Sequence, residues 1–418
     1  MANGLRFVRG RVPWRPAVGV GRRSRRAGGV GVCLTLQACG AGAANGQWIV
    51  TNLHPAGASA SYASSAFRSQ QVGVAQIGGA ARARLWHGDA GTWTDLHPPG
   101  ALNSIAAGIY GSLQVGSVFL PGKAMASMWS GTAASWINLS PPGSTYSEAR
   151  GIFGSQQVGF AQFGPATSHA CLWHGNALSF VSLHPAGATW SDAYCTSADQ
   201  QVGLAVINGA LRSSLWFGTA VSWVNLNPKG ATHSIAFGVS DGQQVGRADF
   251  GGVAHAGLWS GTAVTWIDLH PSLATSSEAL GTTGSMQVGI ARIGGISHAF
   301  LWSGSAESGY DLHNHVPPEF SESQASGIWR DGSGTYVVGS GFNTQTNQYQ
   351  ALIWANLKCL GDLDGNGAVN TSDLVYFLGR FGQTVAPGSP AEVADFNFDG
   401  AVNTLDLLEF LGRFGQPC

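Results

Sequence analysis

The sequence carries little charge and has no long apolar run. Only 10% of its 418 residues are charged, and the first 44 residues hold eight arginines and no acid. Without those eight, 13 of the 21 basic residues remain against 22 acidic ones, so the rest of the chain has no basic patch of the kind that binds nucleic acid. No stretch reaches the roughly 20 apolar residues that span a bilayer as a helix, which argues against a transmembrane segment.

Sequence motifs of catalysis are missing as well. We find no paired carboxylates, nucleophile elbow, phosphate-binding loop or zinc-ligand spacing. Low charge together with 61 glycines and 15 tryptophans favours an all-β body with tight turns over a helical enzyme. The sequence therefore predicts no catalytic residues, and a non-enzymatic protein is the first expectation.

The N-terminal segment has the order of an export signal. Arginines are followed by a modest apolar run at residues 27–38 and by small residues at 41–44, which supply an A-x-A-like cleavage site. We therefore predict a signal peptide at residues 1–44 and an extracellular or cell-surface protein. Two weaker alternatives are a lipoprotein box at residues 36–39, which would anchor the chain, and a twin-arginine signal at residues 24–26.

Residues 45–357 repeat one unit seven times. A strand that ends in leucine before a His-Pro-type turn recurs every 43 or 44 residues, at Leu53, Leu96, Leu139, Leu183, Leu226, Leu269 and Leu312. A Val-Gly pair, usually after Gln, recurs at Val72, Val115, Val158, Val202, Val245, Val288 and Val338. An Ala-x-Leu-Trp-x-Gly strand recurs at Trp86, Trp129, Trp173, Trp216, Trp259, Trp302 and Trp354. So strict a period indicates a repeat architecture.

Each repeat contains about four short extended segments, separated by Gly, Pro or Asn. Four strands at a period near 43 residues are typical of a β-propeller blade. The first strand, residues 48–53, has the phase to complete the last blade and so to close the ring. We therefore predict a seven-bladed β-propeller over residues 45–357, with the Ala- and Ser-rich segments innermost and the tryptophans between the sheets.

Polar residues recur after the repeat leucines, and the histidines among them are His54, His97, His184, His270 and His313. We interpret each imidazole as a cap on the turn before proline, because equivalent positions of a seven-bladed ring lie too far apart to share a metal ion. Asp also recurs before these leucines and alternates with Asn, which indicates turn hydrogen bonds. The seventh repeat departs from the pattern at residues 313–322 and near Arg330, which is either a unique site or a surface insertion.

The repeat resembles the bacterial extracellular repeats named for a His-Ala-Phe tripeptide, the HAF repeats. Residues 298–302, His-Ala-Phe-Leu-Trp, contain the tripeptide in full, and residues 169–173 and 255–259 match it in part. The resemblance implies an exported location and a propeller-like body. It implies no activity.

The tail, residues 358–418, contains the same twelve-residue acidic loop twice. The loops run from Asp362 to Asp373 and from Asp395 to Asp406. Each has oxygen-bearing side chains at positions 1, 3, 5, 9 and 12 and glycine at position 6, the spacing by which a short loop wraps one calcium ion. One apolar helix follows each loop and no full helix precedes it, so we predict a small all-α domain of paired half EF-hands with two Ca²⁺ ions.

This tail resembles a type I dockerin, the calcium-bound module that docks onto a cohesin domain of a partner protein. The resemblance implies that one ion is held by Asp362, Asp364, Asn366, the Ala368 carbonyl, Asn370 and Asp373. It implies that the other is held by Asp395, Asn397, Asp399, the Ala401 carbonyl, Asn403 and Asp406. It places contacts with a cohesin-like partner at Thr371, Ser372, Arg380, Thr404, Leu405 and Arg413.

Six cysteines are present, and the four outside the signal segment are Cys171, Cys195, Cys359 and Cys418. An even number in an exported chain favours disulfides. Cys359 and Cys418 bracket the tail, as in a cysteine-flanked dockerin variant, and a bridge between them would stabilise it by about 4 kcal/mol. Cys171 and Cys195 lie in neighbouring repeats and are expected to be unpaired buried thiols.

The leading hypothesis is an exported, non-enzymatic binding or scaffold protein. Its propeller would be displayed or anchored through the dockerin and would bind glycan or protein on its loop face. One alternative is a carbohydrate-active enzyme, a glycoside hydrolase or polysaccharide lyase, tethered by the dockerin. That enzyme would need two acids near the central cavity from non-equivalent blades, whereas the sequence offers repeated polar positions. The other alternative is a purely structural cell-surface repeat protein with a metal-stabilised tail.

Overall fold

The computed structural model describes residues 48–164, 167–357, 361–363, 368–385, 389, 391–397 and 399–415. Outside these residues lie the predicted signal peptide, Cys359, Cys418, Asp364 and Asn366. Within them, no helix combines the length and the apolar character that a membrane span requires.

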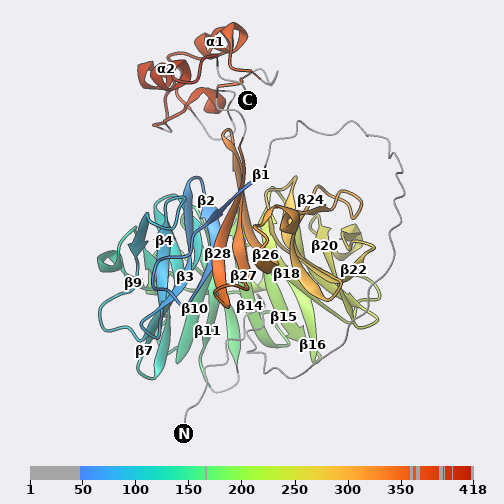
Figure 1. Ribbon diagram of the computed structural model, residues 1–418. Coiled ribbons are helices and arrows are strands. Elements are labelled where there is room, and N and C mark those ends of the chain that lie inside the picture. The colour runs from blue at the N-terminus through green and yellow to red at the C-terminus, as the bar shows by residue number, and fades with distance from the viewer. Residues whose placement is uncertain are drawn as a thin grey trace. The chain divides into compact units, whose positions relative to one another are not determined.

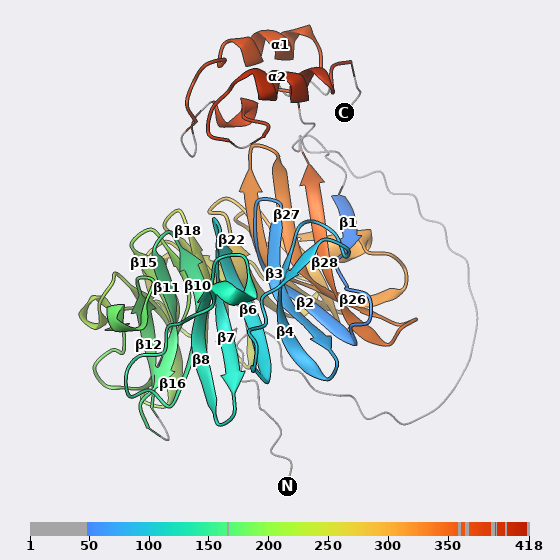
Figure 2. The ribbon, with the colours of Figure 1, turned by 90° about the vertical axis from the view of Figure 1, so that its left-hand side faces the viewer.

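Seven four-stranded antiparallel sheets form the blades of a β-propeller (Figures 1 and 2). The first strands of neighbouring blades pack against one another, and the last of them packs against the first, so these strands form the inner ring. The predicted seven-bladed architecture is therefore confirmed.

Six blades each use four consecutive strands. Blade one is β2 (Ala60–Phe67), β3 (Gln70–Ile77), β4 (Ala80–Trp86) and β5 (Trp93–Asp95). Blade two is β6 (Asn103–Tyr110), β7 (Leu113–Leu120), β8 (Lys123–Trp129) and β9 (Ile137–Asn138). Blade three is β10 (Tyr146–Phe153), β11 (Gln156–Gln162), β12 (Ser168–Trp173) and β13 (Val181–Ser182). Blade four is β14 (Ala188–Ser197), β15 (Gln200–Ile207), β16 (Ala210–Trp216) and β17 (Val224–Asn225). Blade five is β18 (His233–Ser240), β19 (Gln243–Phe250), β20 (Val253–Trp259) and β21 (Ile267–Asp268). Blade six is β22 (Ala274–Thr282), β23 (Gln287–Ile293), β24 (Ile296–Trp302) and β25 (Tyr310–Asp311).

The seventh blade is assembled from both ends of the repeat region. Its inner strands are β26 (Phe320–Asp331), β27 (Gly334–Asn343) and β28 (Gln348–Leu357), and its outermost strand is β1 (Trp48–Asn52). β1 runs antiparallel to β28, with Trp48 opposite Asn356 and Asn52 opposite Leu352. The ring is therefore closed by the N-terminal strand, as the phase of the repeat predicted.

The Gln-Val-Gly motif has a steric and a polar cause, which blade four illustrates. A Cβ on Gly203 would lie 1.9 Å from the carbonyl oxygen of Asp192 on the inner strand, so only glycine fits there. The Gln201 side chain donates to the Asp199 carbonyl at 3.1 Å and accepts the backbone N–H of Gly218 at 2.7 Å. It thereby ties the turn after the third strand to the inner hairpin.

The seven repeat tryptophans are fully buried between adjacent sheets. Trp129 of blade two, for example, packs with Val72 and Leu85 of blade one. Aromatic side chains bury large apolar areas, so these contacts supply much of the apolar stabilisation between blades. Cys171 on β12 is a buried free thiol, as expected, and no disulfide joins it to Cys195. Cys195 on β14 is only partly buried, so the expectation of burial is wrong there.

A recurring hydrogen-bond chain links neighbouring blades. His97 Nδ1 lies 2.8 Å from Ser104 Oγ, and that oxygen also accepts the backbone N–H of Ala83 in the preceding blade. His97 Nε2 donates to the Ala101 carbonyl at 3.1 Å, so Nδ1 is the acceptor for the serine hydroxyl. The serine contact recurs at His54, His184, His270 and His313. The recurring histidines therefore cap turns, as predicted.

The described part of the tail contains two eight-residue helices, α1 (Thr371–Leu378) and α2 (Thr404–Leu411), and a short 3-10 turn, η6 (Glu392–Ala394). Each helix begins with a capping box between an Asn N-cap and the Asp three residues later, which satisfies free backbone N–H groups of the first turn. Two backbone hydrogen bonds join the half of the tail that contains α1 to the half that contains α2. Gly382 N–H donates to the Val402 carbonyl at 2.7 Å, and Gly415 N–H donates to the Val369 carbonyl at 2.8 Å.

Candidate functional site

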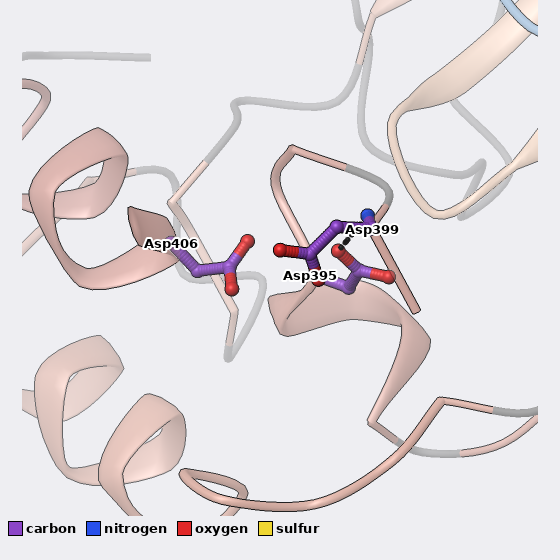
Figure 3. A group of neighbouring side chains, drawn as sticks. All are labelled: Asp395, Asp399 and Asp406. Atoms are coloured by element: carbon purple, nitrogen blue, oxygen red, sulfur yellow. Dashed lines mark hydrogen bonds between the residues drawn. The ribbon is translucent and has the colours of Figure 1, made fainter. Parts of the chain in front are cut away.

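The second acidic loop brings three carboxylates together. Asp395 follows η6, Asp399 lies in the loop, and Asp406 is in the first turn of α2. Figure 3 shows the Asp406 carboxylate pointing toward the side chains of Asp395 and Asp399. One oxygen of each lies within 4.8 Å of the others. Oxygens across a calcium ion are about 4.6–5.2 Å apart, since each lies about 2.3–2.6 Å from the ion, so this set fits calcium.

Asp406 is fixed by the backbone around it. Its side chain is fully buried, and Oδ1 accepts the N–H groups of Phe396 at 2.7 Å and Asn397 at 3.1 Å. Oδ2 accepts the N–H of Asn403 at 2.8 Å. These backbone contacts hold the buried carboxylate from two directions and fix its orientation in the loop.

The charges of the second loop are unbalanced. Burial and the neighbouring carboxylates of Asp406 and Asp399 raise the pKa of Asp395. Hydrogen bonds from the amides of Asn403 and Asn397 hold the pKa of Asp399 below its ordinary value. A hard divalent cation would relieve the repulsion between these acids, and oxygen ligands are those that calcium prefers.

The remaining predicted ligands of this loop lie near the carboxylates. Asn403 Nδ2 donates to Asp399 Oδ2 at 2.9 Å and to the Ala401 carbonyl at 3.2 Å, while its Oδ1 accepts the N–H of Leu405 as the cap of α2. Asn397 Oδ1 accepts the N–H of Asp399 at 3.0 Å. The side-chain oxygens of Asn397 and Asn403 therefore each accept one backbone N–H. Each has a second lone pair left for an ion or for a water bound to it.

The first loop repeats the anchoring of its last residue. Asp373 is fully buried, and it accepts the N–H of Leu363 at 2.6 Å and the N–H of Asn370 at 2.9 Å. Asn370 Nδ2 donates to the Ala368 carbonyl at 3.0 Å, as Asn403 does to Ala401. Asp362 is partly buried at the start of the loop. Asp364 and Asn366 lie outside the described residues, so their placement stays a prediction.

Each tail helix presents an apolar face to solvent. On α1 and the turn after it, Val375, Leu378 and Phe381 are 66, 52 and 44% exposed. On α2 and its turn, Leu408, Leu411 and Phe414 are 62, 49 and 41% exposed. Sequence reasoning did not single out these residues, although the string Phe-Leu-Gly-Arg-Phe-Gly-Gln repeats in both halves. Exposed apolar patches of this kind mark protein interaction surfaces.

The predicted contact residues border these faces. Thr371, Ser372, Thr404 and Leu405 are exposed in the first turns of the two helices. Arg380 lies over the Tyr376 ring at 3.5 Å, whereas Arg413 pairs with Glu409 at 2.9 Å. The two faces therefore share their apolar residues and differ in the polar residues beside them.

The irregular seventh repeat does not gather a metal site. Among the described residues, the group Asp395, Asp399 and Asp406 is the one set of three or more His, Cys, Asp or Glu side chains placed to share an ion. His315 Nε2 lies 2.7 Å from the Tyr310 hydroxyl. The extra residues near Arg330 lengthen the hairpin between β26 and β27, where Trp329 Nε1 donates to Asp331 at 2.9 Å.

Acids of three blades lie at one repeat position of the inner strands: Glu148, Asp192 and Glu278. Asp192 is 1% exposed and lies 3.1 Å from Arg150 Nη2, which is 3.6 Å from Glu148. Burial raises the pKa of Asp192 to about 7. Arg247 of blade five pairs with Glu278 of blade six in the same way. The acids follow the recurring inner-strand serine, and the variability of that position was the signal that could have identified them.

The fold and the loops together define a β-propeller with a C-terminal calcium-loop module of dockerin type. Residues 360–411 match the family described as Dockerin type I domain. Domains of this type bind calcium and imply a cohesin partner. Comparison with the curated proteins finds no match.

Several solved propeller proteins are similar to this chain at low identity. A prolyl endopeptidase is 11% identical at a TM-score of 0.46; the match covers 72% of this chain and 48% of that one, so this chain spans about half its length. The β-propeller domain of the Trilobed protease from Pyrococcus furiosus is 9% identical, with a TM-score of 0.47 and coverage of 71 and 94%. An oligogalacturonate lyase from Vibrio parahaemolyticus is 10% identical, with a TM-score of 0.46 and coverage of 75 and 98%. These similarities are too weak to transfer an activity.

Proposed function

We propose that this is an exported binding protein whose propeller is attached to a cohesin-bearing partner through its calcium-dependent tail. The cluster of Asp395, Asp399 and Asp406 is the observation that carries the proposal, because three carboxylates that share one small volume need a cation to hold the loop closed. The exposed apolar faces of α1 and α2 supply the docking surface. The HAF-type repeats and the arginine-led N-terminal segment support export.

The proposal includes two ions, one in each loop, and an independent tail at residues 358–418. Because the propeller has its own core in every blade interface, loss of the ions should leave its melting unchanged. Asp362→Ala combined with Asp395→Ala is therefore expected to unfold the tail alone. A Cys359–Cys418 bridge belongs to the same proposal, and the mass gain on reduction and alkylation would reveal it.

The test uses the chain without residues 1–44. Calorimetric titration with Ca²⁺ should give two ions per chain, and a panel of immobilised type I cohesin domains should capture the protein in Ca²⁺ but not in EDTA. The proposal would be overturned if the chain binds no calcium, or if cohesin capture is the same in EDTA as in Ca²⁺. Simultaneous loss of both melting transitions in the double variant would contradict the division into two domains.

The acids of the inner strands bear on the alternative of a tethered enzyme. Arg150 lies against Glu148 and Asp192, and Arg247 lies against Glu278. These pairings favour the ionised acids, but burial raises the pKa of Asp192 to about 7, so this carboxyl suits proton transfer near neutral pH. Turnover of a soluble polysaccharide that is lost in Asp192→Asn or Glu278→Gln would favour the tethered enzyme over the binding protein.

A further inference from the structure

One end of the inner circle of strands carries aromatic side chains in some blades and hydroxyl groups in others. It is the end where the first strand of each blade turns into the second. Four blades have an aromatic residue there, which we call the aromatic arc: Phe67, Tyr110, Phe153 and Trp329. Blades four, five and six have Ser197, Ser240 and Thr283 at the equivalent place. Phe67, Tyr110 and Trp329 also pack against the cores between blades. The hairpins of blades four to six form without an aromatic side chain, so the fold does not require one at this place.

The rings of the arc form a continuous wall. Trp329 and Phe67 have centroids 4.4 Å apart, Phe67 and Tyr110 5.0 Å, and Tyr110 and Phe153 4.7 Å. The ring planes are tilted by 45–56° from one to the next. All four residues are partly exposed. Blades seven, one, two and three thus present one curved apolar surface at this end of the ring.

Side-chain amides continue the ring beyond the arc, and we call them the amide row: Gln156, Gln200 and Gln243. Gln200 accepts from Gln244 of the next blade at 2.8 Å, and Gln243 accepts from Gln287 at 2.8 Å. Gln156 accepts from Gln201 at 3.1 Å. With the carbonyl oxygens held by the neighbouring blade, the Nε2 groups are fixed in orientation, and none has an acceptor in the described part of the chain. All three residues are partly exposed.

We propose that the aromatic arc and the amide row bind a neutral glycan chain. Sugar rings place apolar C–H faces against aromatic rings, and their hydroxyls pair with amide donors and serine hydroxyls. The side chains of the arc and the row carry no charge. The charged groups that touch the arc have opposite signs, Arg68 over Phe67 and Asp331 against Trp329, so the surface as a whole fits an uncharged ligand. Stacked bases need a basic groove as well, and the chain beyond residue 44 is acidic overall, which argues against single-stranded nucleic acid.

A proline-rich peptide is the other ligand that aromatic grooves accept. Its backbone offers carbonyl acceptors but few donors, so it would accept from the amide row and from the hydroxyls of Ser197 and Ser240 but leave the acceptor capacity of those hydroxyls unused. A sugar hydroxyl donates and accepts, which matches both groups. The glycan is therefore the better fit to the two halves of the ring taken together.

This inference deepens the proposed function, because it gives the displayed propeller a ligand class. The two can fail separately. Glycan binding should persist in EDTA, which abolishes cohesin capture, and loss of the aromatic arc should leave cohesin capture intact.

The test measures binding of the chain without residues 1–44 to cellohexaose, xylohexaose, mannohexaose and laminarihexaose by calorimetry. Hexagalacturonate serves as the anionic comparison and decaproline as the peptide comparison. Tyr110→Ser and Trp329→Ser copy the residue type that blades four and five already use, so folding should be preserved. Each is expected to weaken binding by about tenfold.

Two further variants make the experiment decisive. Gln200→Leu copies Leu113 of blade two and removes one fixed donor, so it should weaken binding. It also removes the acceptor for Gln244, which keeps its bond to the Gly242 carbonyl, so the melting temperature should fall only slightly. Phe217→Ser removes an aromatic residue that is 41% exposed and lies outside the arc, and it should change nothing. The proposal is overturned if no neutral hexasaccharide binds at millimolar concentration, if Tyr110→Ser with Trp329→Ser binds as tightly as the parent, or if hexagalacturonate or decaproline binds better.

Discussion

Phe377 on α1 and Phe410 on α2 stack with their centroids 5.6 Å apart and their planes 21° apart. The two residues are 33 positions apart, which is also the offset of the two acidic loops. Both are fully buried, and both belong to the apolar core of the tail. The two loops are therefore connected through one shared core, so a change that destabilises either loop should destabilise both helices.

The charge of the second loop can be lowered without disturbing that core. Asp399 is exposed, whereas Asp406 is buried and anchored, so Asp399→Asn removes one carboxylate and keeps the fold. Because fewer charges hold the ion, we expect calcium affinity at this loop to fall by about tenfold or more. Calorimetric titration of the full chain measures it. Glu409→Gln is the matched control, since Glu409 is an acid on α2 outside the cluster, and equal losses in both variants would refute a site at Asp399.

The two apolar faces make a prediction about docking. Val375 and Leu408 occupy equivalent exposed positions on α1 and α2. Because the two halves of the tail are near-duplicates, a cohesin could dock in either of two orientations, one on each face. An aspartate would place a charge in the apolar interface, so Val375→Asp and Leu408→Asp should each abolish docking through their own face. If the two faces are interchangeable, either variant alone keeps cohesin capture. The double variant is then expected to lose about 2 kcal/mol or more of the free energy of cohesin binding. Full loss in one single variant would show that one face alone docks.

The sequence was most informative where one residue has one local role. The period of the tryptophans and the phase of Trp48 predicted the blades and the closing strand, because each position repeats the same packing. The acidic spacing predicted the second loop for the same reason. Contacts between blades could not be read in this way. Arg150 and Asp192 are 42 residues apart, and their pairing depends on how two sheets pack, which no local pattern encodes.

The aromatic arc illustrates a second limit. Its members in blades one to three lie at the repeat spacing, so the sequence could have predicted their alignment. Trp329 joins them only through the longer hairpin of blade seven, which the repeat does not predict. The solvent exposure of the apolar faces on α1 and α2 also depends on tertiary structure. An apolar helical stripe has the same pattern whether it is buried or free.

The Val-Gly pair makes a prediction about stability. A Cβ on Gly203 would meet the Asp192 carbonyl at 1.9 Å, which is backbone and cannot rotate away. Gly203→Ala should therefore destabilise the propeller by about 3 kcal/mol or more, measured by thermal or denaturant unfolding. In Gly164→Ala the new atom would lie 4.0 Å from its nearest neighbour, so this control should melt within about 0.5 kcal/mol of the parent. A mild effect in Gly203→Ala would mean that the inner strand is free to shift.

The recurring histidines predict how the propeller responds to acid. Burial holds the pKa values of His54, His97, His184, His270 and His313 below their ordinary value. The neutral form is the one that fits, because Nδ1 accepts from a serine. Asn227 supports this, since its Oδ1 accepts from Ser234 and its Nδ2 donates to the Ala231 carbonyl, like a neutral imidazole.

The sign of the effect follows from these lowered pKa values. Above about pH 6.5 the histidines are neutral in both the folded and the unfolded chain, so the propeller has its full stability. Below that pH the unfolded chain binds more protons, and stability falls as the pH drops toward the folded-state values. His54→Asn with His184→Asn copies Asn227 and removes two of the groups. The variant should match the parent's melting temperature at pH 8 and lose less of it at pH 5. An equal loss in the two proteins would show that other groups control acid unfolding.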